Sequence, residues 1–213
     1  MRPSAVYSEH RIGTLVAFEG IDRAGKTSVL TRLGASLLGD CKVPVVVSGE
    51  LRSPIASILR DLVHRGCSPF LKTFFFAADR AWSYERECLP TLRRGGLVLW
   101  DRYVDSALAY RAVELSREAC EIDINFVREI NCPFTEPDLT VYLDVSADTS
   151  FERAKKAGTV EPYDRGFLEA VRTEYLRLAH EKGYAVVDGE RPPDSVGWEV
   201  GQLIRQTFKE LFR

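Results

Sequence analysis

The sequence has few of the residues that build metal centres or disulfide frameworks. It contains five cysteines and three histidines in 213 residues, and no two cysteines have C-x-x-C spacing. The cysteines are Cys41, Cys67, Cys88, Cys120 and Cys132, and the histidines are His10, His64 and His180. An odd, dispersed set of cysteines predicts reduced thiols in an intracellular protein, and the isolated histidines predict no zinc site.

Long apolar runs and an excess of one charge are also missing. The longest apolar run, around residues 74–78, is far too short to span a bilayer. Residues 1–13 contain charges and no apolar stretch, so we expect a short disordered lead and not a signal peptide. The net charge of −2 gives no general attraction to nucleic acid or to an anionic membrane. We therefore expect a cytoplasmic protein with neither kind of partner.

Short apolar runs alternate with longer amphipathic stretches along the chain. The runs are rich in β-branched residues and bounded by Gly, Pro or Asp, which is typical of buried parallel strands. The predicted strands are Thr14–Phe18, Val43–Val47, Leu97–Trp100, Leu139–Leu143 and Tyr184–Val187. Because no linker or internal repeat divides the chain, residues 14–213 are expected to form one three-layer α/β domain with a five-stranded parallel sheet.

The most informative motif lies between the first predicted strand and a segment compatible with a helix, residues 28–38. It fits the pattern G-x-x-x-x-G-K-[ST] and reads Gly20-Ile21-Asp22-Arg23-Ala24-Gly25-Lys26-Thr27. The glycines let backbone N–H groups point at phosphate oxygens, and the helix that follows presents its positive end to the anion. Lys26 adds charge at the β- and γ-phosphates, and the Thr27 hydroxyl can ligate Mg²⁺. The motif predicts binding of a nucleoside triphosphate.

Charged side chains recur where other predicted strands end. Ligand sites in parallel α/β sheets lie at the carboxyl ends of the strands, and Asp101-Arg102 follows the third predicted strand. An aspartate there can hold Mg²⁺ through a water, and an arginine can clamp a phosphate with two parallel hydrogen bonds. A structural ion pair is the alternative, which the neighbouring phosphate loop disfavours.

A base-binding pair is predicted on a helix that contains residues 76–80, where Phe76 and Arg80 are one turn apart and share a face. These side chains could stack on a base and read its carbonyl edge. The alternative is that the aromatic residues pack in the core, which we expect for Phe74 and Phe75.

Together these motifs resemble those of thymidylate kinases. The matching segments are Glu19 to Lys26, Phe76 to Arg80, Asp101 to Tyr110 and Pro137 to Thr140, and the resemblance runs from about Leu15 to Val187. Many families share the phosphate loop, whereas the other motifs are more specific. The resemblance implies a P-loop nucleoside monophosphate kinase fold with a short lid at about residues 155–166, and a homodimer.

The resemblance also implies roles for residues around the acceptor nucleotide. Thymine would stack on Phe76 and accept a hydrogen bond at O4 from Arg80. Arg102 would hold the monophosphate, and Tyr110 would press on the sugar where a 2′-hydroxyl would sit. Further acceptor contacts are expected from Arg52 and Ser106.

On the side of the donor nucleotide, residues 20–28 would bind the ATP phosphates and Arg153 would lie over the adenine. Asp22 would lie by the acceptor sugar or the metal. The residues expected to bind ATP are Gly20, Ile21, Asp22, Arg23, Ala24, Gly25, Lys26, Thr27, Ser28 and Arg153, and those expected at the Mg²⁺ ion are Thr27 and Asp101.

The position of the catalytic arginine is the most specific expectation. Phosphoryl transfer needs positive charge on the transferring group, usually from Mg²⁺, a lysine and an arginine. Some thymidylate kinases resemble this chain in carrying that arginine in the phosphate loop, and others carry it on the lid. Here the loop contains Arg23 and residues 158–166 contain few cations. We therefore expect Arg23 to act with Lys26, Asp22 and Arg102.

Three positions depart from the pattern of the family. The second loop, residues 49–54, lacks the first arginine of the Arg-Glu-Pro-Gly-Gly-Thr that many members have, and Arg52 would take over its contact. Arg111 stands where Gln or Ser is common, so it could alter base preference or pair with Glu114. Ala107 replaces a polar residue that contacts thymine in some relatives.

The expected reaction is ATP + dTMP → ADP + dTDP with Mg²⁺. The departures leave open another acceptor, such as dUMP or a modified deoxynucleotide. A protein that only binds nucleotides would be expected to have lost at least one of Arg23, Lys26, Thr27, Asp101 and Arg102, and all are present. A P-loop switch or motor would have no use for a base-reading motif.

Overall fold

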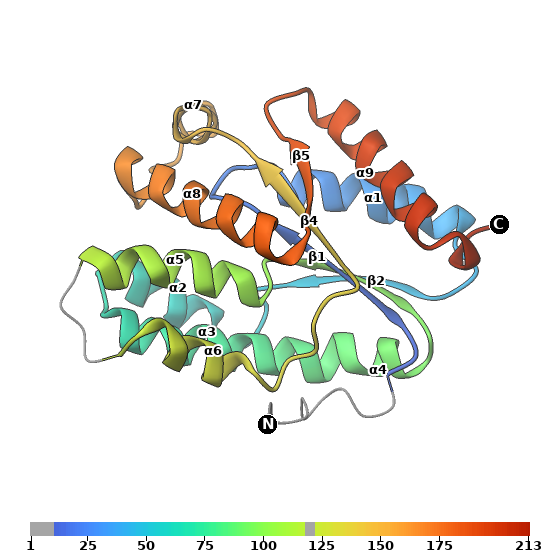
Figure 1. Cartoon of the computed structure of the whole chain (residues 1–213), viewed down its shortest axis with the longest axis horizontal. Coiled ribbons are helices and arrows are strands. Elements are labelled where there is room, and N and C mark those ends of the chain that lie inside the picture. The colour runs from blue at the N-terminus through green and yellow to red at the C-terminus, as the bar shows by residue number, and fades with distance from the viewer. Residues whose placement is uncertain (1–10, 118–121) are drawn as a thin grey trace.

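The computed structural model describes residues 11–117 and 122–213. In this part of the chain five parallel strands form one sheet in the order β2-β3-β1-β4-β5 (Figure 1). The strands are β1 (Thr14–Glu19), β2 (Val45–Gly49), β3 (Leu97–Asp101), β4 (Leu139–Asp144) and β5 (Ala185–Asp188). Each begins and ends within two residues of its predicted run, and the predicted α/β fold is confirmed.

Helices cover both faces of the sheet, which makes three layers. Helices α1 and α9 pack together on one face, and α3, α5, α6 and α8 lie on the other (Figure 1). The α-helices are α1 (Lys26–Asp40), α2 (Ala56–His64), α3 (Pro69–Ser83), α4 (Leu89–Arg93), α5 (Val104–Arg117), α6 (Ile124–Asn131), α7 (Ala147–Lys156), α8 (Arg165–Lys182) and α9 (Pro193–Thr207). A π-helical turn, Tyr84–Cys88, joins α3 to α4, and a 3₁₀ turn, Lys209–Leu211, follows α9.

The three central strands, β1, β3 and β4, bury both of their faces, whereas the edge strands β2 and β5 are less buried. Val16 and Phe18 of β1 belong to the core beneath α1 and α9, and the alternate residues Leu15 and Ala17 pack with Trp100 on the other face. This continuous burial explains why the strands show as unbroken apolar runs in the sequence. Among the described residues no helix combines the length and apolar character needed to cross a membrane.

The expectation that Phe74 packs in the core is wrong, because its side chain is 42% exposed and packs beside the rings of Phe70 and Phe126 on the outer side of α3 and α6. Of the predicted lead, residues 1–10 lie outside the described residues. The backbone N–H groups of Ile12 and Gly13 donate to the carbonyl oxygen of Leu92.

Candidate active site

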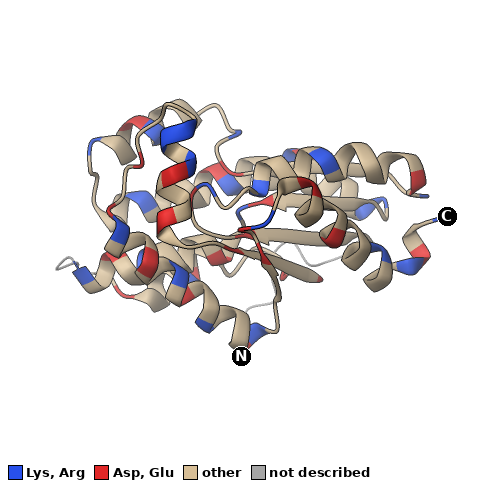
Figure 2. Cartoon of the chain, turned by 90° about the horizontal axis from the view of Figure 1, so that it is seen from above, with Lys and Arg blue, Asp and Glu red and all other residues tan. Residues whose placement is uncertain are grey.

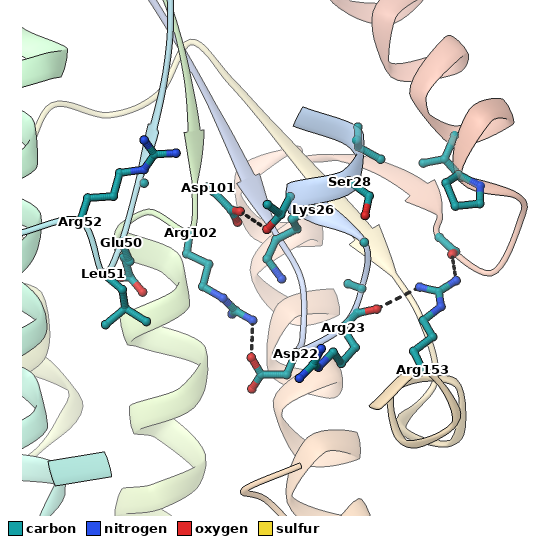
Figure 3. A pocket seen from close by; sticks show the side chains of 18 of the residues that line it. Asp22, Arg23, Lys26, Ser28, Glu50, Leu51, Arg52, Asp101, Arg102 and Arg153 are labelled. Carbon is teal, nitrogen blue, oxygen red and sulfur yellow. Dashed lines mark hydrogen bonds and ion pairs between the residues drawn. The ribbon is translucent and has the colours of Figure 1, made fainter. Parts of the chain in front are cut away.

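A cavity of about 820 Å³ opens over the carboxyl ends of the strands (Figure 3). Its wall is formed by residues 22–29 after β1, residues 49–52 after β2, Asp101 and Arg102 at the end of β3, and Gly189 and Arg191 after β5. Lysine and arginine are interspersed with acidic residues over the molecule as a whole (Figure 2). The cations that face this cavity are therefore a local feature of the strand ends.

The phosphate loop has a backbone that suits its sequence. Gly20 has φ 146°, and a Cβ atom there would lie 2.7 Å from the carbonyl oxygen of Leu143, so only glycine fits. Arg153 from α7 holds the loop from outside (Figure 3): its Nη1 donates to the carbonyl oxygen of Arg23 at 3.0 Å, and its Nη2 donates to that of Gly189 at 2.7 Å. Arg153 thus links the loops after β1 and β5.

Lys26, the first residue of α1, is buried inside the loop. Its Nζ donates to the carbonyl oxygens of Gly20 and Ile21 at 2.9 and 2.8 Å. Burial and the nearby Arg102 lower the pKa of Lys26 to about 8. The protein therefore stabilises the positive charge of this ammonium group only in part. A phosphate bound beside it would add the negative charge that favours the protonated form.

Thr27, the second residue of α1, lies beside Asp101, the last residue of β3. The Thr27 hydroxyl donates to Oδ2 of Asp101 at 2.7 Å (Figure 3). No group of three or more His, Cys, Asp or Glu side chains suited to a metal occurs within residues 11–117 and 122–213. A hydroxyl and a carboxylate beside a phosphate loop fit Mg²⁺, which prefers few protein oxygens together with waters and phosphate oxygens.

Asp22 and Arg102, which line this cavity, form a connected group with Tyr110. Nη2 of Arg102 donates to Oδ1 of Asp22 at 2.7 Å, and the Tyr110 hydroxyl donates to Oδ2 at 2.9 Å. Although burial opposes it, the charges of Arg102 and Lys26 lower the pKa of Asp22 below its ordinary value. Asp22 is therefore ionised and holds the arginine in place.

The backbone is strained at three points around this cavity. Arg23, Leu51 and Arg102 have φ of 60°, 61° and 61°, and they are the non-glycine residues with positive φ in the part of the chain that the structure describes. Each follows a different strand, and all three line the cavity. Each non-glycine residue with this backbone conformation destabilises the folded state by about 1–3 kcal/mol. Such residues cluster where function requires a particular backbone geometry.

Arg23 connects the phosphate loop, to which it belongs, with the predicted lid. Its Nη2 donates to the hydroxyl of Thr159 at 2.6 Å, and Thr159 belongs to the segment that joins α7 to α8. The lid arginine Arg165 points elsewhere, because it pairs with Asp148 and its guanidinium carbon lies 4.6 Å from the centre of the Phe151 ring. Of these two arginines, only Arg23 lines the cavity.

A smaller cavity of about 170 Å³ adjoins the first one. Phe76 and Tyr110 line it together with Ser106, whose hydroxyl also contacts Glu19 and Tyr175, and with Tyr163 of the lid segment. The residues that line both cavities are Asp22, Glu50, Leu51, Arg60 and Arg102. A ligand in the smaller cavity would therefore meet a ligand in the larger one at Asp22 and Arg102.

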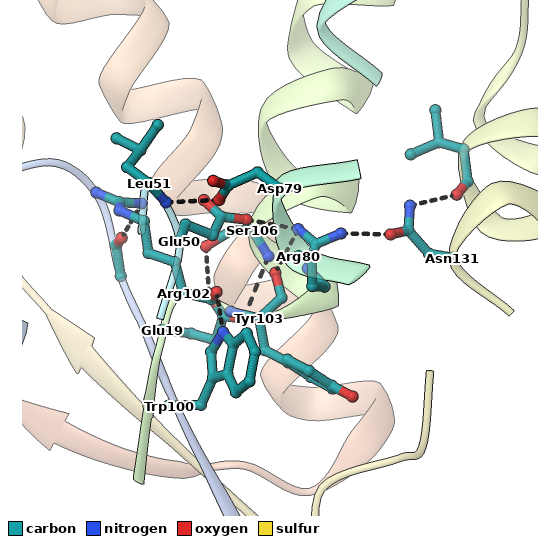
Figure 4. Close-up of polar contacts among 12 residues, drawn as sticks. Glu19, Glu50, Leu51, Asp79, Arg80, Trp100, Arg102, Tyr103, Ser106 and Asn131 are labelled. Atoms are coloured by element: carbon teal, nitrogen blue, oxygen red, sulfur yellow. Dashed lines mark hydrogen bonds and ion pairs between the residues drawn. The ribbon is translucent and has the colours of Figure 1, made fainter. Parts of the chain in front are cut away.

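The structure places Arg80 behind this cavity and not in its wall. The side chain is fully buried, and its guanidinium donates to Asn131, Glu50 and the carbonyl oxygen of Tyr103 (Figure 4). Burial raises the pKa of Glu50 to about 7 in spite of this arginine. Phe76 thus lines the smaller cavity, whereas Arg80 binds Glu50 of the second loop from behind the cavity.

The second loop depends on helix α3 for its shape. The carboxylate of Asp79 accepts hydrogen bonds from the backbone N–H groups of Leu51 at 2.6 Å and Ser53 at 3.1 Å. Arg52 lines the larger cavity and is exposed. A Cβ atom on Gly49 would lie 2.6 Å from the carbonyl oxygen of Asp101, so this backbone leaves no room for the arginine that many family members have there.

Sequence reasoning missed several residues of the site. Arg60 on α2 lines both cavities, and its Nη2 donates to the carbonyl oxygen of Leu51 at 3.3 Å. Lys72 and Tyr163 line the smaller cavity, and Arg191 lines the larger one. Arg60, Lys72 and Tyr163 belong to no motif that identifies them, because they reach the site through the packing of elements distant in sequence. Arg191 has a signal, because it follows β5, and charged residues at strand ends are expected to carry the chemistry.

Known proteins resemble this chain over most of its length. The sequence profile of the thymidylate kinase family matches residues 18–200. A probable thymidylate kinase of Pyrobaculum aerophilum is 36% identical over 91% of this chain and 97% of its own length. Thymidylate kinases of Enterococcus faecalis and Lactobacillus delbrueckii are 35% and 32% identical, each over 94% of this chain and 99% of the relative. The chain therefore belongs to the thymidylate kinase family.

Proposed function

We propose that this protein transfers the γ-phosphate of ATP to dTMP, giving ADP and dTDP. The observation that carries the proposal is the pair of adjoining cavities. The larger one is lined by the phosphate loop, the smaller one by Phe76 and Tyr110, and they share Asp22 and Arg102. The family of the chain supports the same reaction.

The donor triphosphate would lie on the phosphate loop, where backbone N–H groups and the start of α1 attract anions. Lys26 would exchange its contacts with the carbonyl oxygens of Gly20 and Ile21 for the β- and γ-phosphates. Arg153 lies beside the loop, in a position that suits contact with the adenine. Thr27 and Asp101 would hold Mg²⁺, which supplies positive charge to the phosphate oxygens when it is bound.

The acceptor would place its base in the smaller cavity, against the Phe76 ring, and its phosphate beside Arg102. Arg52 and Arg60 would add charge near that phosphate, and Arg52 would replace the arginine that Gly49 excludes. Tyr110 is 7% exposed, and its hydroxyl is held by Asp22. Its ring is thus fixed where it would exclude a 2′-hydroxyl from the sugar.

Transfer would be direct. An oxygen of the acceptor phosphate forms a bond to the γ-phosphorus as the bond between that phosphorus and the β–γ bridging oxygen breaks, and ADP leaves. The protein brings two anions together and neutralises them, and no covalent enzyme intermediate is needed. Arg23 would meet the charge of the transferring group, and the segment that it contacts at Thr159 would close over the site and keep water out.

Two further properties are proposed with the reaction. The rings of Phe70, Phe74 and Phe126 form an exposed aromatic cluster on α3 and α6, which supports a homodimer that packs these helices against a second copy. Light scattering at the mass of a single chain would contradict it. The four described cysteines form no disulfide, which supports the cytoplasm as the compartment.

The acceptor is tested by a coupled assay of ADP release with ATP and Mg²⁺, in which dTMP, dUMP, dGMP, dCMP and UMP are offered in turn. We expect the highest kcat/KM with dTMP. Arg111 and Ala107 line the smaller cavity and motivate dUMP or a modified deoxynucleotide as the second candidate. A preference of tenfold or more for another monophosphate would reject dTMP.

A further inference from the structure

Three charged side chains are buried together beside the smaller cavity. Lys72 on α3 donates through Nζ to Oε1 of Glu114 at 2.7 Å, and Nε of Arg111 lies 2.6 Å from Oε2 of the same carboxylate. The side chains of Lys72, Arg111 and Glu114 are only 8%, 4% and 3% exposed. Two cations therefore share one anion in a place that water hardly reaches.

The two cations of this cluster reach the smaller cavity, and the anion does not. Lys72 and Arg111 line the smaller cavity, whereas Glu114 does not. The guanidinium carbon of Arg111 lies 5.8 Å from the centre of the Phe76 ring, within the range of a cation–π contact. Its contact with Glu114 is made through Nε, so Nη1 and Nη2 lie outside that ion pair. A base placed on Phe76 would therefore lie near guanidinium N–H groups that the ion pair with Glu114 does not use.

Arg80, the residue that the sequence motif favours for reading the base, has its donors engaged elsewhere. Its two terminal nitrogens bind Asn131, Glu50 and a backbone carbonyl oxygen. Releasing Arg80 would leave the Glu50 carboxylate buried without its ion-pair partner, which is costly. Arg111 can reach a ligand without such a loss, because its ion pair with Glu114 is made through Nε, which forms no hydrogen bond there, and does not involve Nη1 or Nη2.

We propose that Arg111, assisted by Lys72, determines base specificity and selects a pyrimidine that presents carbonyl oxygens. The inference rests on the proposed function in one respect, namely that the smaller cavity holds the acceptor base. Arginine and lysine side chains only donate hydrogen bonds, so they match the keto oxygens of thymine or uracil. They oppose the exocyclic amino group of cytosine, since two donors would face each other in a buried site.

Glu114 is a positioning residue in this arrangement. It reduces the repulsion between the two cations and fixes the direction of both side chains from behind the cavity wall. Its substitution by glutamine should raise the KM for dTMP with little change in kcat, and Glu114→Asp should restore part of the loss. A purely structural role would lower the thermal stability without this separation of KM from kcat.

The test measures the affinity for dTMP and for dCMP by calorimetry, so that it does not depend on turnover. Arg111→Gln keeps a side chain of similar reach whose amide can accept as well as donate a hydrogen bond. We expect the ratio of the two affinities, dTMP over dCMP, to fall by at least tenfold in this variant, mainly through weaker binding of dTMP. Arg128→Gln, an exposed change on α6 that lines neither cavity, is the matched control and should leave the ratio unchanged.

Failure of this inference and failure of the proposed phosphate transfer would give different results. An unchanged ratio in Arg111→Gln, in a variant that unfolds cooperatively like the wild type, would overturn the inference and return the base edge to Arg80. If Arg111→Gln does not fold, Lys72→Met is measured in the same way, and a ratio that stays within twofold of the wild type would also overturn it. Wild-type protein that binds dTMP but transfers no phosphate would contradict the proposed function and leave this inference standing.

Discussion

The Arg23→Ala substitution should lower turnover without lowering stability, because the side chain of Arg23 makes few contacts in the folded protein. The side chain is exposed, and its guanidinium makes one hydrogen bond, to Thr159 on the lid segment. The φ of 60° is as strained for alanine as for arginine, so the backbone cost remains in the variant. We expect a free energy of unfolding within about 0.5 kcal/mol of the wild type.

The expected effect on turnover is much larger. Arginines that neutralise a transferring phosphoryl group raise kcat by roughly 10³- to 10⁵-fold. The lid arginine Arg165 is engaged with Asp148, so it is not placed to substitute for Arg23. We therefore expect kcat to fall by about 10³, which corresponds to about 4 kcal/mol of transition-state stabilisation, with a small change in the KM for either nucleotide.

The assay is ADP release at saturating ATP and dTMP, with thermal unfolding measured on the same samples. Arg165→Ala is the matched control, since it removes a cation from the lid and should change kcat by less than threefold. Thr159→Val removes the partner of Arg23 and should affect lid closure without removing the charge. An Arg23→Ala variant that keeps most of its kcat, or an Arg165→Ala variant that loses about 10³, would refute the assignment.

Three other substitutions test separate contacts. Tyr110→Phe removes the hydroxyl that binds the phosphate-loop aspartate and should lower kcat/KM for dTMP by about tenfold, while the variant still rejects UMP in the coupled assay. Arg80→Met leaves Glu50 buried without its partner and should cost about 3–5 kcal/mol in urea unfolding, against less than about 0.5 kcal/mol for the exposed Arg52→Met. Burial raises the pKa of Glu161 from 4.5 to about 7, so wild-type stability should fall as pH rises from 4.5 to 7. Glu161→Gln should therefore be more stable than wild type by roughly 1–3 kcal/mol at pH 8 and equal to it at pH 4, as measured by denaturant titration.

The sheet could be predicted because its signals are local. Parallel strands that are buried on both faces need unbroken apolar runs, and residues that break regular structure bound each run. The runs did not reveal that β1 and β3 continue to Glu19 and Asp101. Glu19 is fully buried, and its carboxylate accepts hydrogen bonds from the backbone N–H groups of Tyr103 and Ser106. These bonds make the burial of the carboxylate possible. A pattern of apolar residues contains no information on such partners.

The site could be predicted only in part, for a related reason. Lys26, Thr27 and Asp101 line the larger cavity as the motifs predict, because Asp101 ends β3 and the other two begin the helix that follows the phosphate loop. Helical periodicity also placed Phe76 and Arg80 on one face of α3. It could not show that the arginine is drawn behind the cavity by Glu50 and Asn131, which come from distant elements.

The buried cluster of Lys72, Arg111 and Glu114 could also be predicted only in part. The sequence allows Arg111 to pair with Glu114, which lies three residues later on the same helix, and this expectation is confirmed. Lys72 joins the pair only because α3 packs against α5. Contacts between helices depend on how the chain folds, so the character of the cavity wall emerges from the structure alone.

The central claim is that one phosphate passes directly from ATP to dTMP at the junction of the two cavities. The most direct measurement uses ATP labelled in the γ-phosphate, together with dTMP and Mg²⁺, and follows the label by chromatography and mass spectrometry. The account predicts labelled dTDP in equal amount to ADP. Label that is found only in inorganic phosphate, or attached to the protein, would contradict it.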